Sequence, residues 1–171
     1  MGSQRGVTLL ELLAVLALVG ITIAFAIVGS LAWIQRQASR SAVYHVQAVL
    51  QSARAEAVAR NRACQVRIDA QARTVRIIDL NLSGTSDDVQ LSRLNLSSTI
   101  RFDRPDAGDP ITLPTLAPGV HEATFEADGT VSSGAGGEIV VRGGDDYHRV
   151  TLFGAGAVRV ERWGHDGWPG S

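Results

Sequence analysis

The sequence predicts an α+β fold in which one long N-terminal helix packs on an antiparallel β-sheet. Two observations support this fold class. No proline occurs between Val7 and Asn61, and apolar residues recur along this stretch at helical spacing. From Gln65 onwards, apolar and polar residues alternate in short runs separated by turn-forming residues. The helix therefore comes first, and the strands of the sheet follow it.

The composition restricts the function classes. The chain has 171 residues, and its 16 basic and 17 acidic side chains give a net charge of −1. It is therefore not a polycation that binds nucleic acid through its overall charge. Cys64 is the only cysteine, which excludes an intrachain disulfide and a cysteine-rich metal site. The histidines show no ligand spacing with one another or with Cys64, so we expect neither a metal site nor a cofactor.

The apolar N-terminal segment has the length of a membrane span. From Leu12 to Ile34 no side chain is ionisable, and a helix needs about 20 mainly apolar residues to cross a bilayer. A secretory signal peptide would have a shorter apolar core followed by a cleavage site. A plain membrane anchor fits the length well. The flanking charges, with Arg5 before the segment and Arg36 and Arg40 after it, do not define its orientation.

The helix is expected to continue beyond this segment. An apolar stripe at spacings of three and four residues predicts that it runs to about Asn61 and packs under the sheet. An uninterrupted helix of this kind would be about 80 Å long. The residues of the stripe are Val43, Val46, Leu50, Ala53 and Ala57.

Alternating residues predict the strands that follow the helix. Two strands, Gln65–Asp69 and Thr74–Ile78, flank a short polar turn, and another strand lies near Thr99–Phe102. The polar stretch 81–98 is predicted to be an irregular loop. The prolines of the stretch 101–118 favour an edge strand or a loop over a central strand. The predicted sheet as a whole occupies residues 64–163.

Two turns predict β-hairpins in the last third of the chain. The Asp128-Gly129 pair suits a turn that needs a positive φ. Residues 154–156 form the loop of the closing hairpin, because this register brings apolar residues opposite each other and pairs one arginine with one glutamate. The facing pairs in this register are Leu152 with Val158, Val150 with Val160, and Arg149 with Glu161.

No combination of residues indicates catalysis. A lone cysteine after a helix, such as Cys64, is more often a small buried side chain than a nucleophile. Asp145, Asp146 and His148 are close in sequence, but the glycines before them predict a solvated loop. The stretch SSGAGGE lacks the Lys-Ser/Thr that a phosphate-binding loop requires. We therefore expect a protein that is not an enzyme, with a membrane-anchored periplasmic enzyme as a remote alternative.

The stretch RGVTLLELLAVLALVGI resembles the N-terminus of type IV prepilins and type II secretion pseudopilins. Arg5 and Gly6 match the end of the leader peptide, and Glu11 matches the glutamate of the family motif. The resemblance implies cleavage by a prepilin peptidase between Gly6 and Val7, and N-methylation of Val7, where the family usually has phenylalanine or methionine. The chain then divides into a leader (1–6), a transmembrane assembly helix (7–34) and a periplasmic domain (35–171) that begins with the second half of the helix (35–61).

Glu11 has two interpretations. As an acid at the start of a helix, it would be stabilised by the helix dipole by about 0.3–1 kcal/mol. The resemblance implies instead that Glu11 pairs with the α-amine of Val7 in an adjacent subunit of a filament. A buried charge in an apolar environment is costly unless it has a partner or a task. The second interpretation therefore explains why a carboxylate stands at the head of this segment.

The stretch 124–163, TFEADGTVSSGAGGEIVVRGGDDYHRVTLFGAGAVRVERW, resembles the GspH/FimT branch of minor pseudopilins. The resemblance implies a type IV pilin-like fold and a minor pseudopilin of a bacterial type II secretion system. It also implies a single-pass inner-membrane protein with its C-terminal domain in the periplasm. The implied partners are other major and minor pseudopilins, prepilin peptidase, inner-membrane lipid and the secretion-system assembly platform. A FimT-like minor type IV pilin, involved in pilus assembly or DNA uptake, is the alternative.

The alternative function makes basic residues near the closing hairpin candidates for DNA contact. The predicted ion pair between Arg149 and Glu161 interrupts a continuous basic patch. Non-specific DNA binding needs several phosphate contacts, so we do not expect nucleic acid as a partner. The candidate residues are Arg142, Arg149, Arg159 and Arg162.

Overall fold

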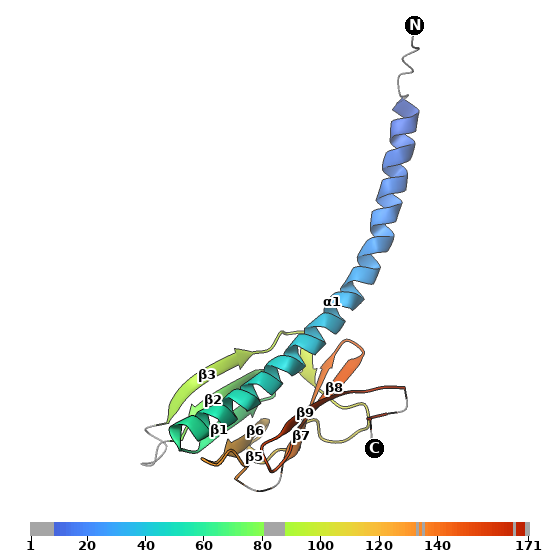
Figure 1. The fold of residues 1–171 in the computed structure, drawn as a ribbon. Helices are drawn as coiled ribbons and strands as arrows, with labels where there is room; N and C mark the ends of the chain where they lie inside the picture. The colour runs from blue at the N-terminus through green and yellow to red at the C-terminus, as the bar shows by residue number, and fades with distance from the viewer. Residues whose placement is uncertain (1–8, 81–87, 133, 135, 166, 170–171) are drawn as a thin grey trace. The chain divides into compact units, whose positions relative to one another are not determined.

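The structure is a computed structural model that describes residues 9–80, 88–132, 134, 136–165 and 167–169, without the side chains of 25–33, 35 and 36. One helix and nine strands lie in these ranges (Figure 1). The elements are α1 (Leu9–Arg60), β1 (Cys64–Asp69), β2 (Thr74–Asp79), β3 (Val89–Asn95), β4 (Ile100–Phe102), β5 (Thr115–Ala117), β6 (Val120–Phe125), β7 (Gly137–Gly143), β8 (Asp146–Leu152) and β9 (Val158–Arg162).

The chain divides into two compact units. The first unit comprises residues 1–34, and its described part is the first half of α1. The second unit comprises residues 35–171, and it contains the second half of α1 and all the strands of the described ranges.

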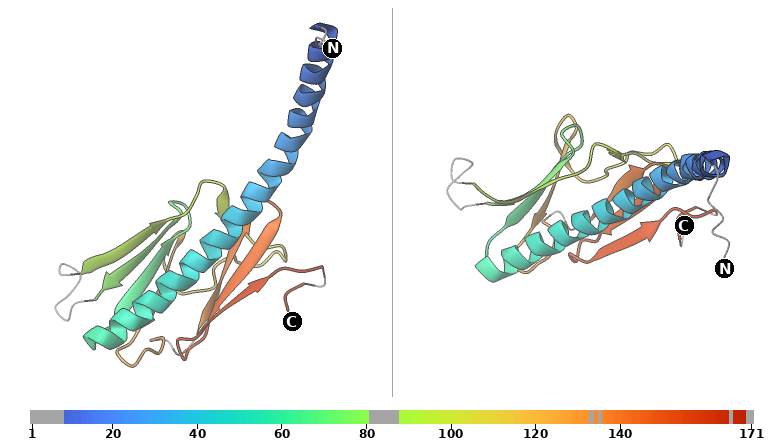
Figure 2. Two further views of the ribbon diagram at one scale, coloured as in Figure 1. Left: turned by 45° about the horizontal axis from the view of Figure 1, so that its top comes forward. Right: turned by 90° about the horizontal axis from the view of Figure 1, so that it is seen from above.

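Within the second unit, the strands form two antiparallel sheets where the sequence predicts one. The five-stranded sheet has the order β3-β2-β1-β6-β5, and the four-stranded sheet has the order β4-β7-β8-β9. The second half of α1 lies along the line where the two sheets approach each other (Figures 1 and 2). The α+β class and the packing of the helix on antiparallel strands are confirmed. The prediction of a single sheet is corrected to two sheets that share one helix.

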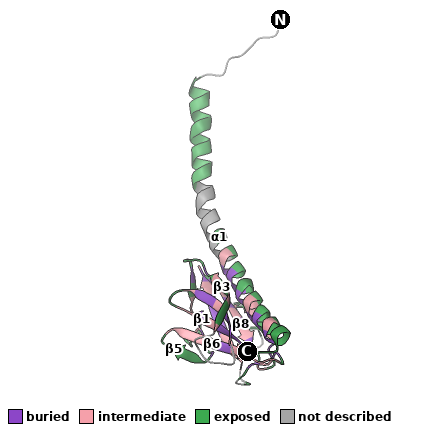
Figure 3. Ribbon diagram, turned by 90° about the vertical axis from the view of Figure 1, so that its left-hand side faces the viewer, coloured by how far each residue is buried: buried purple, intermediate pink, exposed green. Residues whose placement is uncertain are grey.

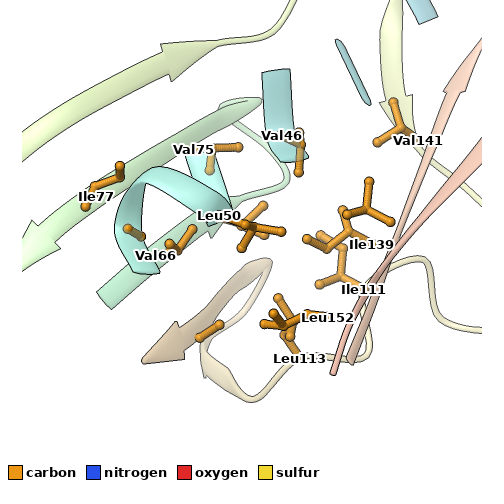
Figure 4. Close-up of a cluster of buried hydrophobic side chains, with 14 of the residues drawn as sticks. Val46, Leu50, Val66, Val75, Ile77, Ile111, Leu113, Ile139, Val141 and Leu152 are labelled. Atoms are coloured by element: carbon orange, nitrogen blue, oxygen red, sulfur yellow. The ribbon is translucent and has the colours of Figure 1, made fainter. Parts of the chain in front are cut away.

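The apolar stripe of α1 forms the centre of the core. All five residues of the stripe have exposed fractions of 0%, which confirms the predicted packing face. Figure 4 shows Leu50 among Val66 and Val75 of the five-stranded sheet and Ile139 and Leu152 of the four-stranded sheet. The opposite side of the same helical half is exposed (Figure 3). One helix face therefore holds both sheets together.

The predicted loop 81–98 is wrong in its second half, because β3 occupies Val89–Asn95. Among the described residues this strand is an edge strand that pairs with β2 alone, and the pairing is interrupted by an irregularity at Ile77 and Ile78. Most of its side chains are exposed, with Leu91 and Leu94 half-buried. The irregular pairing interrupts the alternation of apolar and polar residues, so the sequence pattern does not indicate a strand. Residues 81–87 lie outside the described residues.

The other predicted strands and turns are found. β1, β2 and β4 lie within one residue of their predicted bounds, and β5 is the predicted edge strand in the proline-containing stretch. Gly129 has a φ of 80°, and the carboxylate of Asp128 accepts a hydrogen bond from the Thr130 amide at 2.9 Å. All three predicted residue pairs of the closing hairpin are observed between β8 and β9.

Candidate functional site

The N-terminal motif is described only from residue 9. The predicted cleavage site, Gly6 and Val7, lies outside the described residues. Glu11 lies in the first turn of α1, where the partial positive charge of the helix start stabilises an acid. The motif therefore places a carboxylate at the beginning of the helix, four positions after the predicted new N-terminus.

Between Leu9 and Ala24, α1 presents mainly apolar side chains in every direction. From Leu9 to Ala24 every residue is exposed in the isolated chain, with exposed fractions of 79% for Leu9, 70% for Leu18 and 59% for Ile21. A helix that is apolar all round belongs in a hydrophobic core, in a membrane or among other helices. This half of α1 is thus built for an apolar environment.

Within the described residues, no helix meets both the length and the apolarity that crossing a membrane requires. Of the predicted span 7–34, residues 7 and 8 and the side chains of residues 25–33 lie outside the described part of the chain.

The four arginines that are candidates for DNA contact lie on the four-stranded sheet, and each of them faces a carboxylate. Arg142 donates to Asp103 at 2.9 Å, and Arg162 donates to Asp146 at 2.7 Å. Arg149 and Arg159 share the carboxylate of Glu161, and Arg159 approaches it only to 3.7 Å. The acidic partners offset the positive charge locally. Arg142, Arg149 and Arg159 lie on one face of the sheet, and Arg162 lies opposite His148 on the other face, so the four arginines do not form a continuous basic patch.

We predict that the full chain binds duplex DNA weakly, with a Kd no lower than about 10⁻⁶ M at physiological salt. Most of the guanidinium groups are already engaged by carboxylates, which a phosphate would have to displace. Titration of labelled duplex at several salt concentrations measures this. Tight and steeply salt-dependent binding that is lost in Arg149→Ala or Arg159→Ala would contradict the prediction and favour a role in DNA uptake.

The prediction of a solvated loop for the Asp145–His148 cluster is wrong for two of its members. Asp145 is exposed in the turn, but Asp146 and His148 belong to β8 and have exposed fractions of 6% and 5%. Alternate residues of a strand point to the same face, and this face is directed at the core. The Ser39 hydroxyl of α1 lies 3.1 Å from Nδ1 of His148, and burial lowers the pKa of this histidine. The cluster therefore fixes α1 to β8.

A second ionic network joins segments that no sequence pattern relates. Arg104 donates to Asp106 at 2.7 Å and to Glu138 at 2.9 Å, and Glu138 also accepts from Arg149. The guanidinium group of Arg149 lies 4.6 Å from the ring centre of Trp168, which is buried near the C-terminus. The Trp168 indole donates to Asp106 at 3.3 Å. This network attaches the C-terminal segment to the outer face of the four-stranded sheet.

The network predicts a pH-dependent contribution to stability from Asp106. The hydrogen bond from Arg104 lowers the pKa of Asp106 from 3.8 to about 2. A lowered folded-state pKa stabilises the fold above the unfolded value, and this contribution is lost as the pH falls from about 4 to about 2. Asp106→Asn should lower the thermal unfolding midpoint at pH 7 by about 1–3 °C, and the difference from wild type should disappear near pH 2. An equal difference at both pH values would contradict this role.

Cys64 is buried in the core, as predicted, and burial raises the pKa of its thiol. A buried thiol with a raised pKa is a poor nucleophile. In the described part of the chain, no group of three histidine, cysteine, aspartate or glutamate side chains is arranged to hold a metal ion.

Comparisons with solved structures agree with this fold. The type IV minor pilin FimU from Pseudomonas aeruginosa is 21% identical, with a TM-score of 0.54 over 77% of this chain and 98% of that chain. The minor pseudopilin EpsH from the type 2 secretion system of Vibrio cholerae is 17% identical, with a TM-score of 0.55 over 71% of this chain and 94% of that chain. No curated protein sequence matches the chain. At these identities the similarity establishes the type IV pilin-like fold.

Comparison with protein families gives two matches. The prokaryotic N-terminal methylation motif matches residues 1–31. The type II transport protein GspH family matches residues 42–156, which is more than half of the chain and most of the second unit. The chain therefore belongs to the GspH family of type II transport proteins, and it begins with the N-terminal methylation motif of prokaryotic pilin-like proteins.

Proposed function

We propose that the chain is a minor pseudopilin of a bacterial type II secretion system, where it is a structural component of the pseudopilus that supports protein export across the outer membrane. The observation that carries this proposal is the division of α1. Between Leu9 and Ala24 it exposes mainly apolar side chains all round, with an acid in the first turn, and its second half is packed into a folded unit of the GspH family. A helix of this kind suits insertion into a bilayer and then into a filament of similar helices.

The proposal assigns a task to each part of the chain. Prepilin peptidase cleaves between Gly6 and Val7, and Val7 becomes the methylated N-terminus. Residues 7–34 anchor the chain in inner-membrane lipid as a single pass, and residues 35–171 lie in the periplasm. Other major and minor pseudopilins and the assembly platform are the partners. The methylation motif at residues 1–31 supports the processing step.

A minor type IV pilin is the second candidate, because the chain is as similar to the pilin FimU as to the pseudopilin EpsH. A pilin of this kind would take part in pilus assembly or DNA uptake. Both candidates share the processing step and the filament environment. They differ in which filament depends on the chain.

Deletion of the gene from its own bacterium separates the candidates. For a pseudopilin, we expect exported enzymes to accumulate in the periplasm, while pili and DNA uptake stay normal. Restoration of export by the plasmid-borne chain excludes effects on neighbouring genes. Loss of pili or of transformation with normal export would favour the second candidate. Hydrolase activity in the purified full chain would favour the remote alternative of an anchored periplasmic enzyme.

A further inference from the structure

Three arginines stand directly opposite one another across neighbouring strands of the five-stranded sheet. Arg67 of β1 faces Arg76 of β2, and Arg76 faces Arg93 of β3. On the other side of β1, Arg67 faces Glu122 of β6. The strands lie side by side in Figure 1, so Arg67, Arg76 and Arg93 form a line across the sheet, which we name the arginine row.

The arginine row lies on the face of the sheet that points away from α1. Val66 and Ile68 flank Arg67 in β1 and pack in the core with the helix, as Val75 and Ile77 do on either side of Arg76. Leu94, next to Arg93, also packs against this core. Alternate residues of a strand point to opposite faces, so the whole arginine row is on the outer face. Its side chains are half-buried in β1 and β2 and exposed in β3.

In the chain without a partner, the arginine row is destabilising, because it has more hydrogen-bond donors than acceptors. Like charges directly opposite one another in a sheet repel. Arg76 has no hydrogen bond or ion pair within the described part of the chain, and the buried Nε of Arg67 has no acceptor there. Arg67 donates to Gln65, whose amide donates to Glu122, and Arg93 donates to the neutral Asn95. The single carboxylate at the end of the row does not neutralise three guanidinium groups.

We propose that the arginine row is a docking surface for the acidic face of a second pilin-like subunit. Guanidinium groups bind carboxylates through paired hydrogen bonds, and a partner that supplies them would convert a repulsive row into a set of ion pairs. Neighbouring strands lie about 4.8 Å apart, and residues one helical turn apart have Cβ atoms about 5–6 Å apart. Glutamates at positions i and i+4 of a partner helix therefore match the spacing of the row. This inference rests on the proposed function.

The charges around the arginine row favour a protein over nucleic acid. The row offers three cations, and Glu122 closes one end of it. A phosphate backbone that continued along this line would meet the Glu122 carboxylate, and duplex binding with useful affinity draws on more phosphate contacts than three. A short cluster of carboxylates on a protein would end where the row ends, so it would not meet Glu122. The charge and the length of the arginine row therefore match a limited acidic patch on a protein.

Binding of a defined acidic helix tests the proposal. The probe is a fluorescent helical peptide with glutamates at i and i+4 spacing, and the full chain is held in detergent micelles. We expect binding at low salt that falls about tenfold or more in Arg76→Gln and in Arg93→Gln. Arg101→Gln removes an exposed arginine from the other sheet and should bind as wild type does. The same peptide with glutamines in place of the glutamates should not bind.

Stability distinguishes a docking role from a structural role. Relief of the like-charge contacts in Arg76→Gln should raise the thermal unfolding midpoint of the free chain by about 1–3 °C at low salt, and salt should reduce the gain. A lowered midpoint would mean that Arg76 serves the fold, and it would overturn the proposal. Equal peptide binding by all variants, or a preference for duplex DNA over the acidic peptide, would also overturn it. These outcomes leave the export phenotype of the deletion strain, and hence the proposed function, unaffected.

Discussion

Replacement of Gly6 by valine is expected to leave the six-residue leader attached to the chain. The proposed cleavage lies between Gly6 and Val7, and glycine has no side chain to obstruct the cleft of a peptidase. A β-branched side chain at this position adds bulk directly beside the peptide bond that has to be attacked. Cleavage should therefore fail almost completely, while the folded unit of residues 35–171, which contains neither residue, stays intact.

Intact-mass measurement on membrane-extracted protein decides the outcome. In a host that has prepilin peptidase, the wild-type chain should begin at Val7 and the Gly6→Val chain at Met1. Gly20→Val is the matched control, because a side chain added at Gly20 meets nothing within 4 Å. This control should be processed normally. A wild-type chain that still begins at Met1 would contradict the assignment as a pseudopilin.

The sequence was most informative where local periodicity and burial agree. The stripe from Val43 to Ala57 lies on one helix face, and every one of its residues is buried. The closing hairpin was predictable in register, because a shift by one residue would expose Val150 and Leu152 and bury Arg149 and Thr151. Both features depend only on residues that are close in the chain.

Burial that depends on distant segments could not be predicted. The glycines before Asp145 indicate a turn, and the turn is present. Asp146 and His148 are nevertheless buried, because α1 packs over the start of β8 and Ser39 contacts His148. The edge strand β3 was missed for a related reason. It is a strand because it pairs with β2, and its own sequence pattern does not indicate a strand.

Ionic contacts were the least predictable part of the candidate sites. The cross-strand pair of Arg149 and Glu161 follows from the hairpin register, but the contacts of Arg149 with Glu138 and Trp168 do not. The arginine row likewise depends on which strands become neighbours. Strand order is a property of the whole sheet, so only the folded structure shows that Arg76 faces Arg93.

Substitution of Glu11 by leucine is expected to abolish assembly while insertion and folding remain. Under the proposed function, cleavage creates a positive α-amine at Val7, with an ordinary pKa of about 7.7–8.0, four positions before Glu11. In a filament of staggered helices, the amine of a neighbouring subunit can reach Glu11 in surroundings where an unpaired charge is costly. Leucine removes the partner of that amine. It also removes a charge from an apolar segment, so membrane insertion should be unchanged or improved.

Cross-linking between engineered cysteines on this chain and on other pseudopilins measures assembly. The native Cys64 is buried and should not interfere. Glu11→Leu and the uncharged Glu11→Gln should both lose the cross-links, because each leaves the amine without a carboxylate. Thr22→Val, which removes a hydroxyl that donates to the Leu18 carbonyl of its own helix, should cross-link as wild type does. A role limited to the helix start predicts only the small effect of about 0.3–1 kcal/mol that the dipole provides. Normal cross-linking by both Glu11 variants would therefore show that the carboxylate is a tolerated acid at the helix start and that assembly does not depend on its charge.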